Sequence, residues 1–293
     1  MLALVLVLVV VHVLVYDRRL SMSLVGIFGR PFIDLESHLE PYVDLSALDA
    51  LHDEICLAFA EVPADYTGGS HRSMGIMPAS RKDEALVDYG EVIREMTDLE
   101  FLTFRSLSDN PDAIDPHNRR ELTYGEERQV PLSRRQMLWL KVRFGVYFPW
   151  KAYVELIPNE RWTDKSTSEG KSFTKRARAF FPKTIAFIEK LPFKEVGRAN
   201  IMGLEGHDHG TVHRDGEPEE QTSPDHFITF CPSRNKRLFL WDEEKKEKTP
   251  VMGRAYWFND FDYHGVDADP FFRYSLRVDG VFRDDFLERL RQP

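Results

Sequence analysis

Apolar residues in the N-terminal half recur at helical spacing in two segments. In residues 46–62 they return every three to four positions, which predicts a helix with one apolar face and with Ser46 as its N-cap. The same pattern predicts a second helix over residues 83–98. Residues 103–135 are polar and rich in turn-forming residues, so we expect them to be mostly irregular.

From residue 141 the pattern changes to that of β-strands. Residues 141–157 are aromatic and β-branched and are interrupted by Pro149, which predicts strands rather than a helix. One helix returns at residues 182–191, with Pro182 in its first turn. Short apolar runs separated by polar turns then continue toward the C-terminus, a spacing typical of β-sandwiches and small barrels; the runs are NIMGLEG, HFITFCP, KRLFLWD, RAYWFND and RYSLRVDGVF.

The order of these elements predicts an α+β protein. No internal repeat and no Ser/Gly-rich linker divides the chain, so we expect a single domain over residues 22–293. We expect residues 22–140 to form its mainly helical and irregular part, and residues 141–283 its all-β core. The charged run DEEKKEKT at residues 242–249 is expected to be a solvated hairpin turn.

The first 21 residues begin with an apolar run of about 15 residues. This run is shorter than the roughly 20 residues of a spanning helix, and it lacks the basic start and the cleavage site of a signal peptide. Three interpretations of residues 1–21 stay open. The start codon is placed too far upstream and Met22 is the true start, or the segment anchors the protein in a membrane, or it is a buried strand.

Composition and charge argue against several classes of protein. With 42% hydrophobic and 30% charged residues, the chain fits a folded globular protein rather than a disordered or fibrous one. Its formal net charge of −9 argues against a nucleic-acid partner, because neutralising phosphates needs a basic face. Cys56 and Cys231 form no CxxC pair, so neither a disulfide framework nor a thiolate zinc site is predicted. A cytoplasmic location fits this composition best.

Histidine and aspartate are concentrated in residues 207–215, which read HDHGTVHRD. His213 and Asp215 form an H-x-D pair, and side chains two residues apart on an extended segment point to one face. His264 follows 49 positions after Asp215, beyond three β-runs, which is far enough for the chain to return to the pair. Two imidazoles and one carboxylate are the ligand set of non-haem ferrous sites that keep positions open for oxygen and a cosubstrate.

The strand pattern FFRYSLRV beyond His264 places Arg273, Ser275 and Arg277 on one face. A guanidinium and a hydroxyl two residues apart make a good receptor for a carboxylate, because arginine offers a planar fork of donors. We therefore expect Arg273 and Ser275 to bind a carboxylate-bearing cosubstrate. For Arg277 two roles stay open: contact with a substrate carboxylate, or a salt bridge at the end of the barrel.

Together the motifs resemble a known family. HRD at 213–215, His264 and RYS at 273–275 are similar to the signature of the iron(II)- and 2-oxoglutarate-dependent oxygenases. The segments around them resemble the aspartyl/asparaginyl β-hydroxylase and proline-hydroxylase-like branch. This resemblance covers about residues 180–283.

The resemblance implies a double-stranded β-helix (jelly-roll, cupin-like) core with flanking N-terminal helices. It implies that His213, Asp215 and His264 bind Fe(II), and that Arg273 and Ser275 bind 2-oxoglutarate. Oxygen would be the oxidant, succinate and CO2 the coproducts, and an amino acid, free or within a peptide or carrier-bound metabolite, the hydroxylated substrate. Because related halogenases lack the carboxylate ligand, Asp215 favours hydroxylation or desaturation.

Two other interpretations of the chain stay open. His207 and His209 form an H-x-H pair like that of a cupin-type metalloenzyme that does not use 2-oxoglutarate, although the downstream glutamate of such a site is not obvious. The second alternative is a non-catalytic β-helix protein that binds a small acid or a protein partner. In the oxygenase interpretation, His209 is a candidate for contacting substrate or supporting the metal ligands.

Further residues near the motifs are candidates for the substrate pocket. Trp257 and Asn259 are assigned to it together with Arg277, although Trp257 also suits core packing. Arg214 would face away from the metal pair on a regular strand. His226, which opens HFITF, is predicted to be a strand or rim residue. The expected partner is thus a small-molecule or amino-acid-like substrate, with no nucleic acid, and with no membrane unless the N-terminal segment is an anchor.

Overall fold

The computed structural model describes most of the chain. The described residues are 26–62, 89–119, 122, 124, 130, 132–144, 152–158, 165–204, 206–207, 209–216 and 223–292. The apolar segment 1–21, the first part of the predicted helix 83–98 and the interruption at Pro149 lie outside them. Across the described residues, no helix combines the length and the apolar character that crossing a membrane requires.

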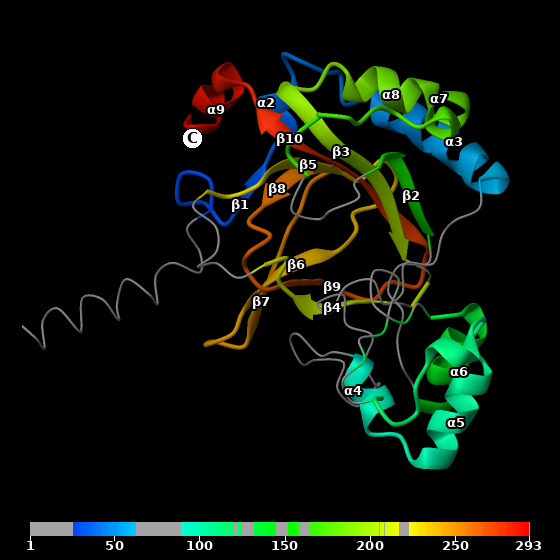
Figure 1. Cartoon of the computed structure of the whole chain (residues 1–293). Coiled ribbons are helices and arrows are strands. Elements are labelled where there is room, and N and C mark those ends of the chain that lie inside the picture. The colour runs from blue at the N-terminus through cyan, green and yellow to red at the C-terminus, as the bar shows by residue number, and fades with distance from the viewer. Residues whose placement is uncertain are drawn as a thin grey trace, which may run out of the picture.

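Two antiparallel sheets form the framework, and helices cover one of them (Figure 1). The helices are α2 (Glu36–Leu39), α3 (Ala47–Glu61), α4 (Tyr89–Arg94), α5 (Asp98–Ser106), the 3-10 helix η4 (Pro111–Ala113), α6 (Arg134–Phe144), α7 (Lys175–Phe180), α8 (Pro182–Ile188) and α9 (Asp284–Leu290). The strands are β1 (Phe32–Asp34), β2 (Ala152–Ile157), β3 (Phe193–Leu204), β4 (Gly210–His213), β5 (His226–Phe230), β6 (Leu238–Asp242), β7 (Glu247–Pro250), β8 (Ala255–Phe258), β9 (His264–Val266) and β10 (Arg273–Phe282). Within the described residues the larger sheet has six strands in the order β1-β8-β5-β10-β3-β2, and the smaller sheet has four in the order β4-β9-β6-β7. This mixture of helices and antiparallel sheets agrees with the predicted α+β class.

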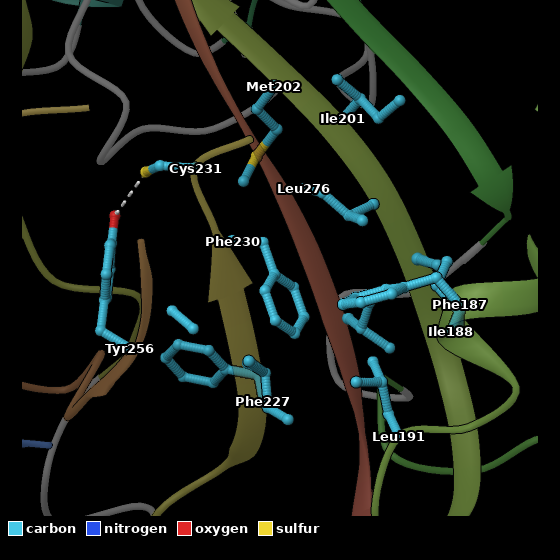
Figure 2. Close-up of a cluster of buried hydrophobic side chains, with 14 of the residues drawn as sticks. Phe187, Ile188, Leu191, Ile201, Met202, Phe227, Phe230, Cys231, Tyr256 and Leu276 are labelled. Carbon is cyan, nitrogen blue, oxygen red and sulfur yellow. Dashed lines mark hydrogen bonds between the residues drawn. The ribbon is translucent and has the colours of Figure 1, made fainter. Parts of the chain in front are cut away.

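Strand β10 lies in the middle of the larger sheet, between β3 and β5, and both of its faces are buried. Leu276 stands opposite Ile201 of β3 and Phe230 of β5, so these three side chains share one face. Helix α8 covers this face, and its Phe187 ring meets Phe230 at 5.1 Å with an interplanar angle of 80° (Figure 2). Arg277 alternates to the opposite face. The sheet therefore has an apolar face under the helices and a buried face that carries polar groups.

The helix predicted over residues 46–62 is confirmed as α3. Its Leu48 and Ile55 are fully buried in the main hydrophobic core, as the apolar spacing predicted. Ser46 does precede the helix, but its hydroxyl donates to the Asp44 carboxylate at 2.7 Å and makes no capping hydrogen bond to the helix. Ser46 therefore occupies the predicted N-cap position without capping the helix through its side chain, because its backbone is already helical (φ −62°, ψ −23°) rather than extended as in a typical N-cap.

Helix α8 begins at Pro182, as predicted, and receives its N-terminal cap from another helix. Phe181 occupies the N-cap position and offers no side-chain acceptor. Instead, the carboxylate of Glu54 on α3 accepts hydrogen bonds from the N–H groups of Lys183 at 2.7 Å and Thr184 at 2.8 Å. The cap fixes α8 against α3, and both helices lie on the larger sheet (Figure 1).

The strand predicted from residue 141 is wrong for residues 141–144, which belong to α6. Ser133 and Gln136 form a capping box at the start of this helix, since each backbone N–H donates to the other side chain, at 2.9 and 3.1 Å. This local signal outweighs the aromatic and β-branched composition that suggested a strand. Residues 152–157 do form the predicted strand, as β2.

Helices α4, α5 and α6 form a small helical lobe with its own hydrophobic cluster (Figure 1). Phe101 and Phe104 of α5 are buried there against Leu140 of α6. The described residues between α5 and α6 are turns and one short 3-10 helix, in line with the irregular segment predicted over 103–135. The part of the chain before residue 141 is thus divided, because α2 and α3 belong to the main core and α4 to α6 do not.

Candidate metal centre

Strands β4 and β9 bring His213 and His264 face to face. The two residues are Cα partners in the smaller sheet, and their ring centroids lie 4.4 Å apart. Gly210 stands opposite Val266, so three steps along β4 match two steps along β9. The extra residue on β4 is a β-bulge, and bulges beside functional sites re-aim side chains. Without it, Val212 rather than His213 would stand opposite His264.

Asp215 approaches the two imidazoles from the bend that follows β4. Its backbone N–H donates to the carbonyl of Asp260 at 2.7 Å, which fixes the bend. Its Oδ1 lies 3.6 Å from Nε2 of His213 and 3.8 Å from Nε2 of His264, and its side chain is 19% exposed. The predicted extended H-x-D segment thus ends at His213, but the Asp215 carboxylate still reaches the imidazoles.

The orientation of His264 prepares one nitrogen to bind a cation. Its Nδ1 lies 2.9 Å from the carbonyl oxygen of Asp262, and a carbonyl can only accept, so Nδ1 carries the proton. The lone pair is then on Nε2, the atom that faces Asp215. Burial lowers the pKa of His264 to about 4, so the ring is neutral near pH 7 and free to act as a ligand.

The donor set fits a divalent transition metal. One ligand atom from each of His213, Asp215 and His264 lies within 4.8 Å of the others, and no second such group occurs in the part of the chain that is described. Burial favours the neutral acid at Asp215, but the neighbouring His264 and Arg277 outweigh it and hold the pKa of this carboxyl well below its usual range. Two imidazoles and one carboxylate therefore face a common point.

Arg277 is engaged by three carboxylates. Its Nη2 donates to Asp260 at 2.6 Å, its Nε to Asp279 at 2.9 Å and its Nη1 to Asp215 at 3.4 Å. The guanidinium also lies 3.8 Å from the ring centroid of Phe227. Of the two roles predicted for Arg277, the structure shows the salt bridge. Contact with a substrate carboxylate loses its support, because the nitrogens already serve acids of the protein.

The charged network extends beyond Arg277 to residues that no sequence motif indicates. Lys165 donates to Asp260 at 2.8 Å and forms an ion pair with Asp225. Arg198 donates to Asp279 at 2.9 Å. Lys165, Asp260 and Arg198 are all nearly or fully buried. None of these residues belongs to a recognisable motif, and only the packing of distant strands and loops brings them together.

Arg273 and Ser275 lie on the same face of β10 as Arg277, and a third polar residue joins them. Lys236 donates through Nζ to the Ser275 hydroxyl at 2.8 Å, and its carbonyl accepts from Nε of Arg273 at 3.1 Å. All three residues are at most 3% exposed. Burial lowers the pKa of Lys236 to about 7; Cys231 opposes this effect, and the charges of Arg273 and Arg277 add to it to a smaller degree. Buried cations beside a hydroxyl fit the carboxylate of an organic acid.

His213, Asp215 and His264 are called the metal group below. His207 and His209 lie outside it. His207 has a positive φ of 67°, and its backbone N–H donates to Asp269 at 2.6 Å, so it is a turn residue. Neither His207 nor His209 belongs to the group of His213, Asp215 and His264. Within the described residues, the cupin-like H-x-H alternative therefore has no third ligand.

The remaining candidates take structural positions. Trp257 is fully buried and donates through Nε1 to the carbonyl of Asp225 at 2.8 Å, which agrees with core packing, while its place in the substrate pocket stays a prediction. Asn259 is 8% exposed. Arg214 lies over the Tyr263 ring at 5.1 Å. His226 is the first residue of β5, as predicted, and its ring stacks on that of Phe282 with the centroids 4.7 Å apart. It therefore contributes to packing in the sheet.

Comparison with known proteins adds structural likenesses only. No protein-family model and no curated protein matches the sequence. Among solved structures, the chain is similar to an oxidoreductase of the 2OG-Fe(II) oxygenase family from Burkholderia pseudomallei, with 9% identity and a TM-score of 0.29 over 43% of this chain and 66% of that one. It is similar to a prolyl-4-hydroxylase from Pseudomonas putida, with 7% identity and a TM-score of 0.27 over 45% and 73%. A third match is a prolyl hydroxylase from Trichoplax adhaerens in complex with a peptide fragment of hypoxia inducible factor, with 11% identity and a TM-score of 0.24 over 41% and 60%. This chain thus spans slightly less than two thirds of the Burkholderia protein, and each match covers less than half of this chain.

Proposed function

We propose that the chain is an Fe(II)- and 2-oxoglutarate-dependent oxygenase that hydroxylates a C–H bond of its substrate. The observation that carries the proposal is the convergence of Nε2 of His213, Nε2 of His264 and Oδ1 of Asp215 on one point. Three protein ligands of this type are characteristic of ferrous oxygenases, because they leave positions for oxygen and a chelating cosubstrate. With these groups bound, the centre supplies oxidation of 2-oxoglutarate to succinate and CO2, coupled to insertion of one oxygen atom into the substrate.

The buried group of Arg273, Ser275 and Lys236 provides the second part of the site. Its guanidinium, hydroxyl and ammonium would bind the distal carboxylate of 2-oxoglutarate, and their burial would exclude water from that contact. Arg277 reaches Asp215 from the same face of β10, so the acid-binding group and the metal ligands share one interior. A single dicarboxylate spanning from the metal toward Arg273 would use both.

We also propose that the two sheets form the double-stranded β-helix implied by the sequence. Their arrangement supports this, since the imidazoles come from the smaller sheet and the acid-binding residues from the larger one. An amino acid, free or within a peptide or carrier-bound metabolite, remains the proposed substrate. That choice rests on the sequence resemblance, because the ion pairs of Arg277 remove the argument that it binds a second carboxylate.

An anaerobic titration tests the proposal. Fe(II) and then 2-oxoglutarate are added to the full chain, and the visible metal-to-ligand charge-transfer band of the chelate is monitored. We expect the band in the unaltered protein and in His209→Ala, and its loss in Asp215→Ala. A well-folded protein without the band would contradict the proposal. Metal-dependent consumption of oxygen and substrate without 2-oxoglutarate would instead favour the cupin-type alternative.

A further inference from the structure

The two carboxylate oxygens of Asp215 have different surroundings. Oδ1 faces Nε2 of both His213 and His264, at 3.6 and 3.8 Å. Oδ2 points the other way, toward Nη1 of Arg277 at 3.4 Å. A carboxylate can bind a metal through one oxygen or through both, and the number decides how many positions stay open for other ligands. A group that hydrogen-bonds Oδ2 therefore influences the coordination number of the metal.

Besides Asp215, two carboxylates and an aromatic ring hold the Arg277 guanidinium. Asp260 accepts from Nη2 at 2.6 Å and Asp279 accepts from Nε at 2.9 Å, while the ring of Phe227 lies 3.8 Å from the guanidinium. The planar fork of arginine cannot turn without breaking one of these charge-assisted hydrogen bonds. Nη1 is thus presented to Asp215 in a fixed direction.

Asp260 positions Asp215 in two ways: directly through the backbone, and through Arg277 at the side chain. Its carbonyl accepts the Asp215 N–H at 2.7 Å, and its carboxylate orients Arg277. Lys165 holds that carboxylate in turn, at 2.8 Å from Oδ2. On the other side of Arg277, Arg198 donates to Asp279 at 2.9 Å. We call Asp260 and Arg277 the inner arm of the network and Asp279 with Arg198 its outer arm.

We infer that Arg277 is a positioning residue, which retains Oδ2 of Asp215 and so leaves only Oδ1 to bind the metal. The inference rests on the proposed function, since it takes His213, Asp215 and His264 as metal ligands. It assigns Arg277 a role other than the substrate contact that was one of its two predicted roles. Groups that orient metal ligands in this way typically contribute 10- to 100-fold to metal affinity.

Binding of Co(II) to the full chain tests this role, because Co(II) reports affinity and coordination geometry in its visible bands. We expect Arg277→Met to weaken Co(II) binding by about 10- to 100-fold and to alter the bands, as Asp215 loses its fixed orientation. The matched control is Arg198→Met, which removes a buried arginine of the outer arm. We expect a smaller loss of affinity than in Arg277→Met, since the hydrogen bond that Arg198 loses is to Asp279, one step farther from Asp215 in the network.

Arg277→Lys keeps the charge and serves if the methionine variant does not fold. The three acids contact three different nitrogens of Arg277, and the one nitrogen of lysine cannot take all three positions, so we again expect weaker binding and altered bands. Unchanged affinity and bands in folded Arg277→Lys would overturn the inference, as would an equal loss in Arg198→Met. Failure of the unaltered protein to bind Co(II) would instead count against the proposed function, and the two failures are therefore distinguishable.

Discussion

The cap that Glu54 of α3 forms at the start of α8 is predicted to contribute to the stability of the protein. Its carboxylate accepts three hydrogen bonds at the start of α8: from the N–H of Lys183 at 2.7 Å, from the N–H of Thr184 at 2.8 Å and from the Thr184 hydroxyl at 2.7 Å. Phe181 at the N-cap position cannot replace it. Replacing Glu54 with alanine removes the acceptor for all three donors and leaves the helix N-terminus without a cap.

The expected cost follows from the donors left behind. A buried donor without a partner costs about 1–3 kcal/mol, and the fully buried Thr184 is in this position. Lys183 is exposed, so water can satisfy its N–H, and the Thr184 hydroxyl can turn to another acceptor. We therefore expect Glu54→Ala to lower the free energy of unfolding by about 3 kcal/mol. Glu54→Gln keeps one carbonyl acceptor and should lose about half as much.

Urea denaturation followed by circular dichroism measures the effect. The control is Glu61→Ala, which removes an exposed glutamate from the end of the same helix and should change stability by less than about 0.5 kcal/mol. Equal slopes of unfolding free energy against urea would show that the same transition is compared. A difference of less than about 1 kcal/mol between the two alanine variants would refute the capping argument.

Three further predictions concern the site. Saturation with Fe(II) or Co(II) at about 100 times its dissociation constant should stabilise the protein by about 2.7 kcal/mol, seen as a higher melting temperature, and Asp215→Ala should abolish this gain; an equal shift in the variant would exclude Asp215 as a ligand. Arg273→Ala should weaken 2-oxoglutarate binding at least about tenfold, because a charge-assisted hydrogen bond is lost, and should leave metal affinity unchanged. Equal losses of 2-oxoglutarate affinity and metal affinity would contradict the proposed role of Arg273. Lys236 has a folded pKa of about 7 and an unfolded value of 10.5, so the unfolded chain binds more protons between these values and the free energy of unfolding should rise with pH across this range. Urea unfolding of Lys236→Met should lack this part of the pH dependence, and parallel profiles of the two proteins would contradict it.

The sequence predicted the metal group because its chemistry lies in a few residue types in a fixed order. His213, Asp215 and His264 need only to be recognised as two imidazoles and a carboxylate, and the intervening β-runs indicate that the chain can return. Lys236 and Lys165 could not be found in this way. Their positions depend on strand pairing and on loops, and a lysine beside a strand normally lies in solvent.

Local signals were decisive where composition misled. Residues 141–144 look like a strand by their aromatic and β-branched content, but the capping box of Ser133 and Gln136 starts a helix that runs through them. The Glu54 cap, by contrast, could not be predicted from the sequence near α8. Its partners lie about 130 residues away in the chain, so no local pattern could reveal it.

The bulge in β4 decides which of its residues meets His264. Three steps separate Gly210 from His213, and the bulge takes up the extra one, so His213 pairs with His264. Deleting one residue between Gly210 and His213 would remove the bulge and leave His213 opposite His264, whereas inserting one residue there would move His213 past that position. Lengthening the exposed turn between β6 and β7 would change the separation of the candidate ligands along the chain and leave their pairing intact. Insertions in that turn should therefore be tolerated, whereas a single insertion in β4 should act as the loss of a ligand.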